Sequence, residues 1–143
     1  MKEYYLFMIN DYFYKNFLKN EIFIFKSLEQ IYKMNKNEYK YAINIFNQIC
    51  IPFNKEKLEK YIYDHHSDDI DYRIINDKHI ISDKLSLEES IMKIHNIFIK
   101  ISTKEHNISF LKSLKAYNKK IFICDFYNQE YSWLNEINNS VLV

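Results

Sequence analysis

The chain has 143 residues, 48% of them hydrophobic, which is enough for one domain with a single hydrophobic core. Its 20 Lys and Arg residues are nearly balanced by 19 Asp and Glu residues, so the net charge of +1 gives no overall electrostatic footprint for nucleic acid, although a local basic patch is possible. Glycine is absent, which excludes the phosphate loops, dinucleotide fingerprints and nucleophile elbows that depend on it.

The N-terminal segment predicts a strand followed by a short helix. Residues 3–9 are an apolar run of aromatic and β-branched type, short enough for a buried strand. Asn10 suits a helix N-cap, and Asp11 lies in the first turn, where a carboxylate interacts favourably with the helix dipole.

The predicted first helix has two apolar strips. Phe13 and Phe17 lie one turn apart on one strip, and Tyr14 and Leu18 lie on a second strip about a quarter turn away. A helix this short can bury one strip and leave the other partly exposed. Aromatic strips at helical spacing usually belong to the core, so burial of both strips competes with an exposed aromatic anchor for a partner.

Three more helices are predicted before the midpoint of the chain. The second begins after Asn20, the third spans about 38–49 and ends before Pro52, and the fourth begins at Asn54. Their apolar faces, at helical spacing, are Ile24, Leu28 and Ile31; Ala42, Ile45, Phe46 and Ile49; and Leu58, Tyr61 and Ile62. The polar residues 64–71 predict a loop.

The second half predicts short strands and one more helix. The candidate strands are 72–75, 80–81, 90–94, 97–101 and 121–126. His95 and Asn96 would form a hairpin turn, residues 104–118 have a helical pattern, and the last strand is apolar on both faces except at Asp125, as in a central strand. This order predicts an α/β fold, with a small mixed β-sheet flanked by helices, in a single domain over residues 1–143.

Cysteine usage and hydropathy predict a cytoplasmic protein. Cys50 and Cys124 have no metal-type spacing, and Cys124 lies in an apolar run where a free thiol behaves as a small buried residue. The N-terminus has no signal-peptide pattern, and no run approaches the roughly 18 apolar residues of a membrane span. We therefore expect reduced cysteines and no membrane segment.

Two clusters offer an alternative reading as a small enzyme. Cys124 and Asp125 lie at the end of the predicted central strand, where α/β proteins often place catalytic groups, but the sequence does not bring a histidine base to them. His65 and His66 lie in the only acidic, histidine-containing cluster, whose spacing fits neither a zinc helix pair nor a calcium loop. We expect no catalytic residues, metal or cofactor.

Both ends of the chain resemble the SirA family, the sporulation inhibitor of replication. The Tyr-Tyr pair at 4–5 leads the first strand into the aromatic helix, and near the other end Asp-Phe at 125–126 precedes Tyr-Ser-Trp-Leu-Asn at 131–135. The family usually has Gly at the position of Ser132. The likeness is good over roughly the first 25 and last 50 residues and loose between about 35 and 85.

The resemblance implies a non-enzymatic inhibitor of chromosome replication initiation that binds the N-terminal domain of the initiator DnaA during sporulation. It places Phe13 and Phe17 at two partner-facing positions, where Phe17 replaces a Tyr. Glu136 occupies a third such position, where the family has Pro. A single-stranded nucleic-acid binder would also use exposed aromatic and Lys residues, but the sequence has no defined basic groove, so no direct nucleic-acid binding is expected.

Overall fold

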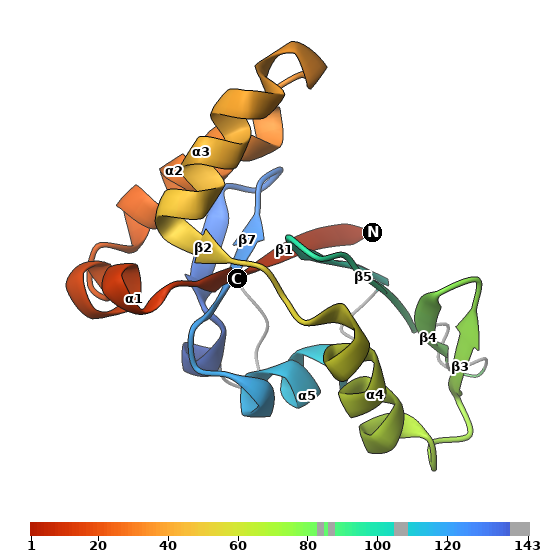
Figure 1. The fold of residues 1–143 in the computed structure, drawn as a ribbon. Coiled ribbons are helices and arrows are strands. Elements are labelled where there is room, and N and C mark those ends of the chain that lie inside the picture. Colours follow the sequence, from red (N-terminus) through yellow and green to blue (C-terminus); the bar gives the residue numbers. More distant parts are fainter. Residues whose placement is uncertain (83–84, 86–87, 105–108, 138–143) are drawn as a thin grey trace.

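One eight-stranded sheet runs through the computed structural model, which describes residues 1–82, 85, 88–104 and 109–137 (Figure 1). The strands are β1 (Lys2–Ile9), β2 (Cys50–Ile51), β3 (Tyr72–Ile75), β4 (Lys78–Ser82), β5 (Glu89–Ile94), β6 (Ile99–Lys104), β7 (Ile121–Asp125) and β8 (Glu130–Trp133). Their order is β3-β4-β5-β6-β1-β7-β8, with β2 paired to β1, and the described pairs are antiparallel. The predicted α/β class with flanking helices is confirmed; the sheet is antiparallel, and larger than the small mixed sheet that was expected.

Helices cover both faces of this sheet (Figure 1). The helices are α1 (Asp11–Phe17), α2 (Glu21–Lys33), η1 (Lys36–Glu38), α3 (Tyr39–Ile49), α4 (Lys55–His66), α5 (Ser109–Tyr117) and η2 (Leu134–Glu136). α2 and α3 bury their apolar faces with Phe7 and Ile9 of β1, whereas α4 and α5 pack with Leu6 and Met8. Because neighbouring residues of a strand point to opposite faces, β1 contributes to two cores. In the described part of the chain, no helix is long and apolar enough to cross a membrane.

The N-terminal predictions agree closely with the structure. The strand, the helix capped by Asn10 and the helix after Asn20 all form, and α3 ends at Ile49, before Pro52. β7 lies between β1 and β8 and is buried along its length, which confirms its predicted central position.

The hairpin between β5 and β6 differs from the prediction by one residue. Ile94 pairs with Ile99, and the His95 N–H donates to the Phe98 carbonyl at 2.9 Å, so the turn residues are Asn96 and Ile97. The β3–β4 turn, in contrast, is made by Asn76 and Asp77 with φ of 49° and 63°. Positive φ at both central residues is typical of a type I′ hairpin, which this glycine-free chain makes with Asn and Asp.

Other boundaries moved because of tertiary contacts. The predicted loop 64–71 begins later, since α4 continues to His66, whose Nε2 lies 2.6 Å from Ser113 Oγ of α5. Lys104 ends β6 instead of starting a helix, and the next described helical residue is Ser109; residues 105–108 of the predicted helix lie outside the described residues. β2 and β8 were not predicted: two residues are too few to show a pattern, and the polar and aromatic alternation of β8 extends over only four residues.

Candidate functional site

The start of α1 is held by Asn10. Its side-chain oxygen accepts a hydrogen bond from the Phe13 N–H at 2.8 Å, and its amide donates to the Gln48 carbonyl at 2.8 Å. The Asn10 N–H also donates to the Ile49 carbonyl, at 2.8 Å. Asn10 therefore caps α1 and joins it to the end of α3, which sets where the side chains of α1 point.

Tyr14 of α1 rests on β8. The Tyr14 ring packs edge-to-face on Trp133 with centroids 5.1 Å apart, and the Trp133 indole N–H donates to the Leu18 carbonyl at 2.9 Å. The Lys119 ammonium lies 5.5 Å from the centroid of the Tyr14 ring. Phe13, Tyr14 and Phe17 are each half-buried against the same core, whereas Leu18 is exposed, so both strips of α1 are partly buried.

The Phe13 and Phe17 strip forms a cluster of stacked rings at the surface. Phe13 stacks on Phe17 at 4.6 Å between centroids, and Phe23 of α2 stacks on Phe17 at 5.1 Å and on Phe13 at 6.3 Å. Phe13 and Phe17 are half-buried, and Phe23 is 44% exposed. Tyr12, 66% exposed, packs its ring against Phe13. We call Phe13, Phe17 and Phe23, with Tyr12 at the edge, the aromatic patch.

A groove adjoins the aromatic patch where α1, α2 and α3 meet. Its volume is about 310 Å³, and it is lined by Phe13, Phe23, Lys26, Ser27, Gln30, Ile45, Gln48 and Ile49. Its lining combines aromatic and aliphatic side chains with uncharged polar groups and one lysine. Such a combination of an apolar surface with polar groups around it is typical of protein interfaces.

Glu136 lies beside the start of α2. Its carboxylate is close enough to Glu21, the first residue of α2, to share a hydrogen bond with it. The pKa of Glu21 is raised, first by burial and then by the charge of Glu136. The structure therefore brings Glu136 to the helix that carries Phe23, while Phe13 and Phe17 contact each other directly.

The Cys124 and Asp125 cluster is built as part of the core. Cys124 is fully buried, and burial raises the pKa of its thiol well above the ordinary value. Asp125 accepts hydrogen bonds from the Asn128 N–H at 3.0 Å and the Asn128 side-chain amide at 2.7 Å, so it caps the turn after β7. A protonated, inaccessible thiol is a poor nucleophile, and this arrangement gives no support to the enzyme alternative at this place.

His65 and His66 also have structural partners. His65 Nδ1 lies 3.0 Å from the Tyr61 carbonyl, whereas His66 is buried against α5 through Ser113. Within the described residues, no three His, Cys, Asp or Glu side chains are grouped so that they could hold a metal ion. The two adjacent histidines thus contact different elements, as expected for neighbouring residues of a helix.

Sequence reasoning missed Phe23 and the groove beside it. Phe23 precedes the buried stripe that begins at Ile24, and it points away from the core that Ile24 enters. The available signal was that Phe23 is a large aromatic residue that lies outside the buried face of its own helix. The stacking of Phe23 on Phe17 depends on the angle between α1 and α2, which the sequence pattern does not contain.

Together these features define a small α/β domain with a rigidly mounted aromatic surface, an arrangement suited to contact with another macromolecule. The family model described as "Sporulation inhibitor of replication protein SirA" matches residues 2–138, almost the whole chain. The protein therefore belongs to the SirA family, a family of replication inhibitors. A comparison with curated protein sequences gives no match.

Proposed function

We propose that this protein inhibits the initiation of chromosome replication by binding the N-terminal domain of the initiator DnaA through the aromatic patch, in the cytoplasm of a sporulating cell. Membership of the SirA family supports the inhibitory role. The observation that carries the proposal is the stack of Phe13, Phe17 and Phe23 at the surface. Partly exposed aromatic rings at the centre of a contact are typical of interface hot spots.

The attachment of α1 favours tight binding. Asn10 holds the start of the helix, and the Trp133 to Leu18 hydrogen bond holds the residue that follows it. A surface that is already in its binding conformation loses little conformational entropy when it associates. The patch can therefore act as a preorganised anchor, with the adjacent groove receiving a side chain of the partner.

Glu136 contributes a carboxylate near this surface. It stands beside Glu21 at the start of α2, where a partner's cation would be attracted by two carboxyl groups. At position 136, where relatives have Pro, this chain would therefore contact its partner with a carboxylate. Inhibition by this route is steric and stoichiometric, since occupation of the initiator's surface requires no turnover and no cofactor.

The test is a binding titration of the purified initiator N-terminal domain with the wild-type protein and the Phe13→Ala and Phe17→Ala variants. Each substitution should weaken binding by ~2 kcal/mol or more, about 30-fold in Kd. Tyr127→Ala is the matched control, because Tyr127 is an aromatic residue, 94% exposed, in the turn after β7. Thermal melting of each variant accompanies the titration. If the two Phe variants have lower melting temperatures, but their folded fraction binds the initiator domain as tightly as the control does, the rings are structural and the proposed interface is wrong.

A further inference from the structure

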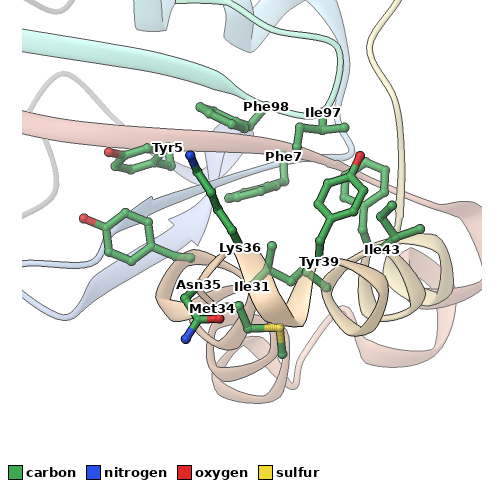
Figure 2. Close-up of a pocket in the computed structure, with 13 residues that line it drawn as sticks. Tyr5, Phe7, Ile31, Met34, Asn35, Lys36, Tyr39, Ile43, Ile97 and Phe98 are labelled. Carbon is green, nitrogen blue, oxygen red and sulfur yellow. The ribbon is translucent and has the colours of Figure 1, made fainter.

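A second, larger groove lies at the other end of the α2 and α3 pair. It has a volume of about 490 Å³, within the range of roughly 300–1,000 Å³ common for ligand sites. It opens between the sheet and the segment from the end of α2 to α3 (Figure 2). The lining residues are Tyr5, Phe7, Ile31, Tyr32, Met34, Asn35, Lys36, Tyr39, Ala42, Ile43, Phe46, Ile97 and Phe98. We call it the helix–sheet groove.

The walls of the helix–sheet groove are almost wholly apolar or aromatic. Only Asn35 and Lys36 among the lining residues have amide or charged side chains. Ala42 contributes only a methyl group on α3, which leaves space that a larger residue would fill. At the rim, Tyr39 is 67% exposed and Ile97 is 45% exposed, so apolar surface remains in contact with water. Such a surface gains free energy when an apolar chain covers it.

Lys36 places a positive charge over this apolar surface. Figure 2 shows its side chain extending from η1 across the groove, with the ammonium on the side of Tyr5 and Phe98. The ion pairs found among the described residues do not include Lys36. Its backbone is fixed by a capping box, in which the Asn35 side chain accepts from the Asn37 N–H at 3.0 Å and Glu38 accepts from the Asn35 N–H.

A row of lysines continues from the edge of the groove across the sheet. Tyr5 of β1 is paired with Lys100 of β6, Lys100 with Lys93 of β5, and Lys93 with Lys78 of β4. Residues paired across antiparallel strands share a face, so all three lysines are on the face of Tyr5. Like charges directly opposite one another are destabilising, and the Glu3 carboxylate, 3.6 Å from the Lys100 ammonium, offsets only part of this. An anion at this end of the groove would relieve the repulsion.

We propose that the helix–sheet groove binds a single-chain anionic amphiphile, an acyl chain with a carboxylate or phosphate head group. The acyl chain lies along the packed rings of Phe7 and Phe98, whose centroids are 6.2 Å apart, and against Ala42, and the head group lies between Lys36 and Lys100. The Lys100 ammonium, 5.7 Å from the centroid of the Tyr5 ring, borders this position. Charge complementarity favours an anionic head over a neutral one, and the small volume favours one chain over two. This site is separate from the aromatic patch and does not depend on initiator binding.

The test uses isothermal titration calorimetry of the full chain with laurate, dodecyl phosphate and neutral dodecyl maltoside, each below its critical micelle concentration. One equivalent of laurate or of dodecyl phosphate should bind, and the ratio of their affinities shows which head group the site prefers. Dodecyl maltoside should bind at least tenfold more weakly than the better of the two. Chemical shifts in ¹H–¹⁵N spectra should change at Ile31, Ala42 and Phe98. Ala42→Leu, which fills the groove with a good helix former, should remove binding.

Lys36→Gln tests the head-group contact at an exposed position that is expected to fold normally. It should weaken the binding of laurate or dodecyl phosphate at least tenfold, while Lys40→Gln, an exposed lysine outside the groove, should leave binding unchanged. Both groove variants should keep the affinity of the wild type for the initiator domain. The proposal is overturned if neither anionic amphiphile binds, if dodecyl maltoside binds equally well, if Lys36→Gln has no effect, or if only an acidic amphipathic peptide shifts the groove resonances.

Discussion

The indole N–H of Trp133 donates a hydrogen bond to the carbonyl of Leu18 at 2.9 Å, joining residues 115 positions apart. Leu18 follows α1, and Trp133 ends the strand β8 at the edge of the sheet. The contact gives the end of α1 a partner for one of its free carbonyl groups. It also fixes α1 against the core, where Phe13, Tyr14 and Phe17 are each half-buried.

Removal of the Trp133 side chain should destabilise the protein. Trp133 is fully buried between Tyr14 and Phe122, so Trp133→Ala should lower the free energy of unfolding by ~3–5 kcal/mol. Trp133→Phe keeps an aromatic ring but removes the N–H donor, so it should lower the free energy of unfolding by less than Trp133→Ala does. Urea titrations followed by circular dichroism measure both changes. An unchanged midpoint for Trp133→Ala would show that the ring does not anchor α1.

Phe23→Ala should weaken binding to the initiator domain by about 2 kcal/mol, since it removes one ring of the aromatic patch. Its effect on stability should be smaller, because the side chain is 44% exposed and its removal leaves no closed cavity. Surface plasmon resonance measures the affinity, and a melting curve measures the stability. Tyr127→Ala again serves as control; equal affinities for the two variants would remove Phe23 from the interface.

Replacement of Glu136 by Gln should lower the pKa of Glu21. Burial and the Glu136 carboxylate both raise that pKa, and the substitution removes the second cause and leaves the first. A carboxyl group whose pKa is higher in the folded state adds stability at low pH, and this stability is lost as the pH rises through the folded-state pKa. The gain in stability on acidification should therefore be smaller in Glu136→Gln.

A ¹³C NMR titration of the Glu21 carboxyl group and melting curves at several pH values measure these effects. Glu56→Gln, an exposed position on α4, is the control for loss of one negative charge. A Glu21 titration curve that is the same in Glu136→Gln and in the control would show that the two carboxyl groups do not interact.

Glycine in the β3–β4 turn should stabilise the hairpin. At φ of 63°, Asp77 bears a steric penalty of about 1–2 kcal/mol that glycine avoids, at an entropic cost of about 0.5–1 kcal/mol. Asp77→Gly should thus raise the free energy of unfolding by roughly 0.5–1 kcal/mol. Asn96→Gly is the matched control, since Asn96 is not among the described residues with positive φ; it should lower stability. Chemical denaturation measures both changes, and a loss of stability in Asp77→Gly would contradict the prediction.

Local chemistry made several elements predictable from the sequence. Asn10 caps α1 because its side chain reaches only the next few N–H groups, and Pro52 limits α3 through its own ring. The apolar residues of β7 identify a central strand, because burial on both faces requires apolar residues at every position. The resemblance at the two ends of the chain identified the family, which the family model confirms.

The tertiary structure decided the features that depend on how distant segments meet. The register of Ile94 with Ile99 moved the hairpin turn, and the contact with Ser113 extended α4 to His66. Helical spacing placed Phe13 and Phe17 on one strip, but it could not show how far each strip is buried, since the contacts of Tyr14 and Leu18 with Trp133 come from the other end of the chain. The sequence by itself determined which residues share a local face. Only the packing of α1, α2 and β8 determined which of those faces remained in water, because burial depends on segments that local periodicity does not relate.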